Sequence, residues 1–387
     1  MAKTEVVMKI GVISDTHKDS KNAIPHIIKE FKKRDVEIIL HCGDLIPEHV
    51  SNELFGNFPV FCALVEGQKD DPAFGVKKPI GWQFTKPNER VIKLPDDTLI
   101  YLGHKKHLEF MRATEEKFNE ILTDLRQEFD GLRIVFGGHL HFQTYKQGQL
   151  VSFINPGAVE DALGWGYEYA ILDTSTSQVV FSRILPTPDD RPTFSVGVIS
   201  DSLDITHRDA TYWARQAIEF QKRGVTNIIH CGNIALTDIG RPELKNFSVH
   251  YAIRADQKSD HEKIKKTSTI PINWHVIAEE NLDDGAVVDI NNYRFFVQLD
   301  LGLKFMTVNE VGMDSMAMQI RRKHPETQFV LCGFTREALL LEGQQVITIN
   351  PGDVSTARNF AVICLPRREI TFGHVPYDPL PELGHKK

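Results

Sequence analysis

Two short segments of the sequence place metal-binding residue types two positions apart. Asp15 and His17 lie in SDTH, and His139 and His141 lie in GGHLH. In an extended turn, side chains two residues apart point to the same side, so each segment can present two ligand atoms together. A carboxylate oxygen beside an imidazole nitrogen suits manganese, iron, zinc or nickel better than calcium or magnesium. The two segments therefore indicate a transition-metal site.

Other polar turns of the first half carry further candidate ligands. Asp44 ends HCGD after a glycine that lets the backbone turn sharply, and each of its carboxylate oxygens could serve one cation. His139 and His141 could likewise each face a different metal. Two ions about 3.5–4 Å apart polarise a phosphate and lower the pKa of a shared water. One such turn alone is weak evidence, but their number and order favour a two-metal centre over helix capping.

Rigid elements must hold these turns, and short apolar runs predict them. We expect buried strands at KIGVIS, VEIILH, PVFCALV, TLIYLG, RIVFGG, SFIN and YAILD, each followed by a polar turn. Between the first two runs, a helix over about 20–34 would bury Ile24, Ile27, Ile28 and Phe31. Polar residues at strand ends are the usual site placement in α/β architectures. The pattern predicts an α/β fold with the site along one edge.

The second half of the chain repeats the first. GVISD occurs at 11–15 and 197–201, and FKKRDVEIILHCGD (31–44) shares eight of fourteen letters with FQKRGVTNIIHCGN (220–233). A repeat of this length indicates domain duplication. The break falls in LPTPDDRP (185–192), where proline and charge replace strand patterning. We predict one domain over 1–188 and a second over 189–387. The second copy of the helix, over about 208–223, would bury Ala214, Ala217, Ile218 and Phe220.

Most of the candidate ligands are missing from the second copy. Asp201 keeps the place of Asp15, but the other positions change to Leu203, Asn233, Phe334 and Arg336, replacing His17, Asp44, His139 and His141. Asp256 and Asp300 align less surely with Gln68 and His104. We expect no metal in this copy, and we expect Arg336 to pair with Asp201, because a buried carboxylate needs a partner.

Some residues recur in both copies although the chemistry does not. His41 returns as His230, and Asn155 returns as Asn350 within NPG. Retention in a copy that has lost its ligands favours a hydrogen-bonding or turn-forming role for both pairs.

The order of the polar turns resembles the calcineurin-like metallophosphoesterases, specifically their small bacterial and archaeal phosphodiesterases. That pattern is D-x-H, GD, GN, H, GHxH and NPGS. The resemblance covers nearly all of residues 8–185 and, in decayed form, 194–375. It implies two tandem four-layer α/β/β/α sandwich domains. It also implies a ligand set in which Asp44 bridges two metals, the first held by Asp15, His17 and His141 and the second by His104 and His139.

Three departures from the family pattern fall on the second metal. Gln68 stands where the family has an asparagine ligand, Lys69 follows it, and His107 lies close enough to His104 to compete for the ligand role. Lys69 could neutralise developing phosphate charge, although a solvated lysine is the alternative. The catalytic candidates are Asp44, His104 and Lys69. The metal-ligand candidates are Asp15, His17, Asp44, Gln68, His104, His139 and His141.

The resemblance implies a phosphodiesterase in which a metal-bound hydroxide attacks phosphorus in line. Its cofactors would be two divalent transition-metal ions, manganese first and iron, zinc or nickel as alternatives. Phosphodiester small molecules or short nucleic acids are the expected substrates. The second half would be structural or regulatory, and the two halves would form a fused pseudo-dimer. Gln68 and Lys69 favour the alternative, a non-catalytic docking protein of the same fold.

Composition narrows the class of protein further. The chain has 387 residues, 41% hydrophobic and 25% charged, which is typical of globular domains. Its net charge of −7 argues against a broad basic face for duplex DNA or an acidic membrane. The five cysteines form no CxxC pair, no apolar run could span a bilayer, and the start carries no signal peptide. We expect a cytoplasmic enzyme that contacts no membrane.

Overall fold

The protein is described by a computed structural model. The described residues are 8–17, 21–65, 68, 79–85, 90–104, 115–139, 141–148, 151–159, 166–187, 189–203, 205–253, 255–267, 270–278, 285–299, 301, 310–333, 337–343 and 345–376. Among them, no helix has both the length and the apolar character required to cross a membrane.

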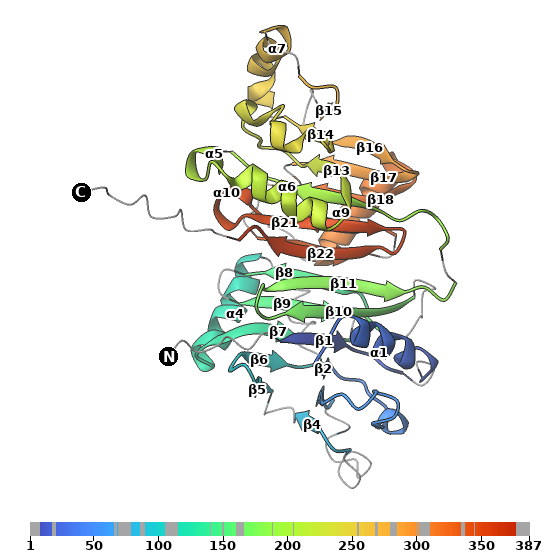
Figure 1. Cartoon of the computed structure of the whole chain (residues 1–387). Helices are drawn as coiled ribbons and strands as arrows, with labels where there is room; N and C mark the ends of the chain where they lie inside the picture. Colours follow the sequence, from blue (N-terminus) through green and yellow to red (C-terminus); the bar gives the residue numbers. More distant parts are fainter. Residues whose placement is uncertain are drawn as a thin grey trace, which may run out of the picture.

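Two sheets run through both halves of the chain (Figure 1). The larger one has twelve described strands, in the order β15 (Trp274–Ala278), β14 (Ser248–Ala252), β13 (Val225–His230), β12 (Phe194–Ile199), β21 (Asn359–Leu365), β22 (Glu369–His374), β11 (Gln178–Ile184), β10 (Tyr167–Asp173), β1 (Lys9–Ile13), β2 (Ile38–His41), β3 (Val60–Ala63) and β4 (Trp82–Thr85). The smaller one has ten, in the order β16 (Ala286–Ile290), β17 (Tyr293–Gln298), β18 (Thr327–Cys332), β20 (Ile347–Asn350), β19 (Leu339–Glu342), β8 (Gln143–Gln147), β9 (Ser152–Pro156), β7 (Leu132–Phe136), β6 (Leu99–Leu102) and β5 (Val91–Lys93).

The two halves meet through two antiparallel strand pairs, β11 with β22 and β8 with β19, which we call the seam. At the seam Val180 pairs with Thr371, and Tyr145 pairs with Leu340. On either side of these pairs, the strand order of one half is the reverse of the other. The seam therefore relates the first half, up to β11, to the second half, from β12, by an approximate two-fold rotation.

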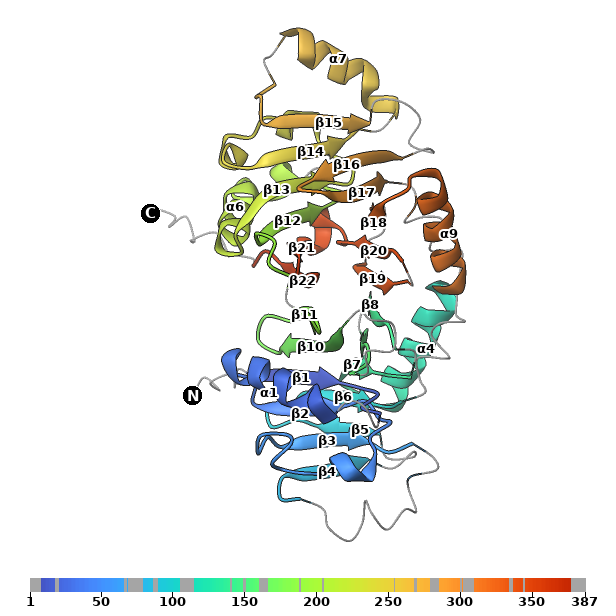
Figure 2. The same ribbon diagram turned by 90° about the vertical axis from the view of Figure 1, so that its right-hand side faces the viewer.

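The layers follow from where apolar side chains are buried. One hydrophobic core lies between the two sheets and continues across the seam, with Ile10, Leu40 and Phe136 from the first half and Val198 and Leu331 from the second. Helices cover the outer faces, as Figure 2 shows. Helices α1 (Ile24–Lys33) and α6 (Tyr212–Lys222) lie on the larger sheet, and α4 (Glu115–Glu128) and α9 (Glu310–Lys323) lie on the smaller. The order of layers is α/β/β/α.

The remaining helices are short or peripheral. They are α5 (Ile205–Arg208), α7 (Lys258–Thr267) and α10 (Val354–Ala357).

The predicted helix of the first half is confirmed, whereas half of the buried face predicted for its counterpart was wrong, since Ala217 and Phe220 are buried but the other two residues are not. Ile24, Ile27, Ile28 and Phe31 of α1 are all buried. In α6, Ala214 and Ile218 are exposed, and the buried face is instead formed by Tyr212, Trp213, Gln216, Ala217 and Phe220. The large rings of Tyr212 and Trp213 occupy that face. The Tyr212 hydroxyl donates a 2.7 Å hydrogen bond to Gln216 Oε1, and this bond allows the polar Gln216 side chain to be buried.

A charged cluster is buried on one side of the seam. Arg183 contacts Glu342 across the seam and lies 3.1 Å from Glu168 Oε1, and all three side chains are at most 4% exposed. Burial and the neighbouring Glu342 carboxylate raise the pKa of Glu168 well above its usual range, whereas Arg183 lowers that of Glu342 against the effect of burial. The Arg183 guanidinium therefore lies between two buried carboxyl groups, and the partly buried Arg368 guanidinium is close enough to interact electrostatically with Glu342.

Removing that cation should destabilise the whole chain. Arg183→Leu would remove the cation that contacts both buried carboxyl groups, so we expect the free energy of unfolding to fall by about 3–5 kcal/mol. Urea denaturation should also show one transition for both halves, because they share a core. Arg294→Leu, which breaks an exposed pair with Asp289, is the control and should have little effect. Two well-separated transitions in the wild type would contradict the shared core.

Candidate metal centre

The candidate ligands of the first half lie where strands end. Asp15 follows β1, Asp44 follows β2, His104 follows β6, and His139 and His141 follow β7. All of these except His104 have positive φ, between 54° and 84°, which is uncommon for non-glycine residues and is tolerated best by aspartate, asparagine and histidine. Gly138 permits the approach of β7 to β1, because a Cβ there would lie 2.0 Å from Ser14 Oγ. The backbone conformation thus brings the turns that carry the candidate ligands close together.

Asp15, His17 and His141 form the first group of ligand atoms. The Nε2 atoms of His17 and His141 are 3.2 Å apart, and His141 Nε2 is 3.4 Å from Asp15 Oδ1. Two imidazole nitrogens and a carboxylate oxygen that converge in this way can bind a transition metal.

Asp15, Asp44 and His104 form a second group, so Asp15 belongs to both. His104 Nε2 is 3.9 Å from Asp15 Oδ1 and 3.2 Å from His139 Nδ1. Asp44 Oδ2 is 3.8 Å from His17 Nδ1 and therefore also reaches the first group. The structure brings together six of the seven predicted ligands, with two carboxylates between the groups.

Burial separates a closed floor from an open rim. The side chains of Asp15 and His104 are 0% and 3% exposed, whereas those of His17, Asp44 and His141 are 30–34% exposed. Among these described side chains, those of the rim are the ones that a substrate can reach from solvent.

The protonation states suit metal binding near neutral pH. Burial alone would raise the pKa of Asp15, but the neighbouring His141 and His104 imidazoles, the nearby Ser14 hydroxyl and a hydrogen bond from the His139 amide lower it to about 2. Burial lowers the pKa of His104. Its Nδ1 lies 3.2 Å from the Cys42 carbonyl, which can only accept, so the free lone pair is on Nε2, facing the site.

A buried carboxylate oxygen of Asp15 provides an independent test of whether these residues fit a metal ion. Asp15 Oδ1 is buried and accepts no hydrogen bond from any described residue. Such an orphan acceptor is costly unless another group satisfies it. The donor set of carboxylates and imidazoles around it fits a divalent transition-metal ion.

The Gln68 side chain is engaged with the backbone. Its Nε2 donates to the Leu45 carbonyl at 2.8 Å, and its Oε1 accepts from the Val65 amide at 3.3 Å. In the second half, Gln257 Nε2 donates to the Ile234 carbonyl at 3.0 Å. Gln257, and not the neighbouring Asp256, is thus the counterpart of Gln68. Lys69 and His107 lie outside the described residues.

The recurring histidines are parts of a hydrogen-bond network. The Gly43 amide donates to His41 Nδ1 at 3.2 Å, so the proton is on Nε2, which lies 2.8 Å from Thr16 Oγ1. His230 has the same two contacts, with the Gly232 amide and Ser202 Oγ. Burial lowers the pKa of both histidines to about 3, so both are neutral. Asn155 and Asn350 likewise each accept a hydrogen bond from the glycine amide of their turn.

In the second half, the Asp201 carboxylate is hydrogen-bonded to an asparagine amide. Asn233 Nδ2 donates to Asp201 Oδ1 at 3.0 Å, and Ser200 Oγ donates to Asp201 Oδ2 at 2.6 Å. The counterpart of His104 is Leu299 and not Asp300, because the carbonyls of His104 and Leu299 accept from Gly138 and Gly333 respectively. Arg336 and Phe334 lie outside the described residues, so the predicted pair between Arg336 and Asp201 stays a prediction.

Sequence reasoning missed two residues that position the site. Ser14 contributes to the low pKa of Asp15, and its recurrence in GVISD was a signal that could have identified it. His49 lies in a buried turn, with Nδ1 3.1 Å from the Thr16 carbonyl, and it therefore supports the loop that carries His17. The sequence gives no comparable signal for His49.

Comparison with known proteins identifies the family of the first half of the chain. Residues 8–177 match the family described as the calcineurin-like phosphoesterase superfamily domain. This part of the chain is a calcineurin-like phosphoesterase domain. The phosphoesterase domain is similar to phosphodiesterase MJ0936 of Methanocaldococcus jannaschii, with 28% identity over 176 residues, 44% of this chain and 96% of the relative.

Two further comparisons concern the same domain. A probable metallophosphoesterase of Methanothermobacter thermautotrophicus is 29% identical over 152 residues, 39% of this chain and 77% of the relative. A solved structure described as a novel archaeal phosphodiesterase is 22% identical, covers 46% of this chain and 100% of its own, and has a TM-score of 0.34.

The Gln68 contacts generate a prediction about its role. Gln68→Leu and Gln257→Leu should each lower the free energy of unfolding by about 1–2 kcal/mol, because each removes the same loop hydrogen bond. Neither should change the number of metal ions per chain, measured by elemental analysis. Loss of one metal in Gln68→Leu but not in Gln257→Leu would instead make Gln68 a ligand.

The buried histidines generate a prediction about pH. The unfolded chain protonates His230 near pH 6.5, whereas the folded chain does so only at about pH 3. Its contribution to stability is therefore complete above pH 6.5 and is lost as the pH falls. From pH 7 to pH 5, the unfolding free energy of the wild type should fall by about 2 kcal/mol more than that of His230→Gln. The exposed His26, changed to glutamine, is the control. Parallel curves for wild type and His230→Gln would contradict a neutral buried His230.

Proposed function

We propose that the chain is a two-metal phosphodiesterase that acts through a domain over 1–188. The observation that carries this proposal is the convergence of two carboxylates and four histidines from separate strand ends, inside the region that matches the phosphoesterase family. The similarity of this region to proteins named phosphodiesterase and metallophosphoesterase supports phosphodiester hydrolysis as the class of reaction.

Each residue of the site has a proposed part. Asp15, His17 and His141 would hold one ion, and His104 and His139 the other, with Asp44 between them. When bound, two divalent ions would polarise the phosphate ester and lower the pKa of a water to near neutrality. Manganese is the first candidate, and iron, zinc and nickel suit the same donors. Lys69 is a further candidate for stabilising charge on the phosphate.

The protein itself fixes the positions of the candidate ligands and keeps water away from the buried part of the site. Asp15 is ionised near pH 7, His104 presents a fixed lone pair, and the buried floor keeps both from moving. The half-exposed rim of His17, Asp44 and His141 leaves room for a phosphodiester, either a small molecule or a short nucleic acid. The site is therefore pre-organised before substrate arrives.

The proposed second domain, over 189–387, is a metal-free copy with a structural role. The matching strand order across the seam and the equivalent networks of His41 and His230 support duplication of one ancestral domain. Asn233 occupies the place of Asp44 and bonds Asp201, which gives that carboxylate a neutral partner. The two domains thus form a pseudo-dimer within one chain. The five free cysteines are consistent with the cytoplasm as its location.

A docking protein of the same fold is the second candidate function. The observation in its favour is the Gln68 amide, whose contacts with the Leu45 carbonyl and the Val65 amide leave the second metal with fewer ligands. The activity assay that follows distinguishes the two functions.

Hydrolysis of bis(p-nitrophenyl) phosphate with added Mn²⁺ tests the proposal. The wild type should show turnover that is lost on chelation, and Asp44→Asn should lower kcat/KM at least about 100-fold, because it makes the change that the second half already carries at Asn233. Elemental analysis should show metal loss in the same variant.

The second half offers a matched control for this assay. Asp201→Asn alters the counterpart of Asp15, and it should leave both turnover and metal content unchanged, whereas Asp15→Asn should abolish both. Turnover that does not depend on metal, or that survives Asp44→Asn, would contradict the proposal and favour the docking protein.

A further inference from the structure

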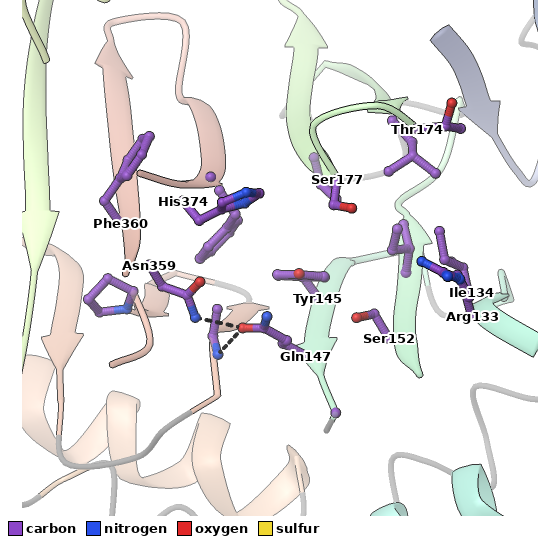
Figure 3. A pocket seen from close by; sticks show the side chains of 18 of the residues that line it. Arg133, Ile134, Tyr145, Gln147, Ser152, Thr174, Ser177, Asn359, Phe360 and His374 are labelled. Carbon is purple, nitrogen blue, oxygen red and sulfur yellow. Dashed lines mark hydrogen bonds between the residues drawn. The ribbon is translucent and has the colours of Figure 1, made fainter. Parts of the chain in front are cut away.

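A cavity of about 270 Å³ lies at the seam between the two sheets (Figure 3). Residues from both halves line it, including Arg133, Tyr145 and Gln147 from the first half and Ala338, Asn359 and His374 from the second. Its volume is close to the lower limit for small-molecule sites, roughly 300 Å³. The cavity could therefore hold one small organic molecule.

The cavity lies at the far end of the sheets from the metal centre. It is lined by Arg133 near the start of β7, whereas His139 follows the end of that strand. Six residues of extended chain span about 20 Å. Thr174 also lines it, next to Asp173, which pairs with Lys9 at the start of β1, whereas Asp15 follows the end of β1. The cavity is thus a separate feature of the molecule.

The approximate two-fold rotation of the seam gives the cavity a counterpart. The strand registers make Gln147 equivalent to Glu342, and His374 equivalent to Arg183. The cross-strand pairs agree, because Glu168 lies opposite Arg183 and Asn359 lies opposite His374. The surroundings of the cavity can therefore be compared position by position with those of the buried charged cluster.

On the side of the charged cluster, side chains fill the space that corresponds to the cavity. Gln143 extends its amide into it and donates to the carbonyls of Pro156, Tyr169 and Ser182 at 3.0–3.4 Å. Arg183 and Glu342 close the same side. The side chains of Gln143, Arg183 and Glu342 therefore occupy this side of the seam.

On the side of the cavity the equivalent of Gln143 is Ala338, which has no amide to extend. The counterparts of the three carbonyl-bearing residues are Pro351, Phe360 and Gly373, and all three line the cavity. The cavity is therefore the volume that a glutamine fills on the other side of the seam. Asn359 and Gln147 stand where the charged cluster has Glu168 and Glu342, so the charges are missing as well.

Several polar groups face the cavity without a partner. Gln147 Oε1 accepts from Asn359 Nδ2 at 2.9 Å and from the Ala338 amide at 3.1 Å, and this leaves the Gln147 NH₂ group and Asn359 Oδ1 without hydrogen bonds to described residues. Arg133 has no ion-pair partner in the described parts of the chain. No described lining residue is acidic. These features favour an anion with further hydrogen-bonding groups.

The other wall of the cavity is aromatic. The rings of Tyr145 and Phe372 have centroids 4.9 Å apart, and Phe360 lies nearby. Flat rings pack well against such a wall. A ligand with one flat ring and an anionic group would satisfy both the aromatic wall and Arg133.

We propose that the seam cavity binds a nucleoside monophosphate, with its phosphate at Arg133, its base against Tyr145 and Phe372, and its polar edges at Gln147 and Asn359. The ligand class rests on the proposed function, because cleavage of nucleotide phosphodiesters releases such products. A product site at the seam would couple the second half to the state of the first.

Isothermal titration calorimetry on the full chain tests this site. The protein is treated with a chelator, and UMP, CMP and AMP are titrated in turn, with uridine and inorganic phosphate as probes of the ring and the anion alone. At least one nucleotide should bind with one site per chain, and more tightly than either partial probe. Binding should be undetectable in Ala338→Gln, which restores the glutamine of the other side, and about tenfold weaker in Arg133→Gln.

Matched variants keep the result unambiguous. Arg322→Gln, on the exposed side of α9, should bind as the wild type does. If Ala338→Gln does not fold, Gln147→Glu with His374→Arg copies the Glu342 and Arg183 pair and should block binding instead. No nucleotide binding by the wild type, or equal binding by the filled variants, would overturn the proposal. Because the assay uses neither metal nor turnover, that result would leave the phosphodiesterase proposal standing.

Discussion

Pairing of sheet edges is the constraint on which the rest of this molecule depends. Strands β8 and β11 would otherwise be the edges of the two sheets in the first half, with unpaired backbone groups open to aggregation. The second half pairs both edges with its own equivalent strands, β19 and β22, and continues the core between the sheets. This edge pairing gives the second half a structural contribution that does not depend on any chemistry of its own.

The proposed division of roles between the halves accounts for the features that the second half shares with the first and for those that it lacks. Its sheet contacts, the His230 network and the loop glutamine Gln257 repeat those of the first half. Asp201 and Asn233 even keep the positive φ of Asp15 and Asp44. Aspartate and asparagine tolerate that conformation better than other non-glycine residues, so the backbone limits which residue can replace a carboxylate ligand there. The side chains changed while the turns stayed.

The sequence predicted the strand-end turns, and the structure places six of the candidate ligands close together there, because motifs report local geometry directly. It did not predict the seam. Strand β8 reads QTYKQ, and nothing in that run shows that Gln143, Thr144 and Lys146 are buried by pairing with a distant strand. The role of Gln68 depends on the Leu45 carbonyl, which no motif encodes. The cavity depends on differences between equivalent positions of the two halves, among them Gln143 and Ala338. Contacts between distant segments decided each of these features.

The most direct measurement of the central claim is the anomalous scattering from crystals of the full chain grown with Mn²⁺. Our account predicts two manganese peaks per chain, both within ligand distance of Asp15 or Asp44, and none near Asp201 and Asn233. A peak between Asp201 and Asn233, or no peak beside Asp15 at saturating Mn²⁺, would contradict the assignment of one metal centre to the first half and a structural role to the second.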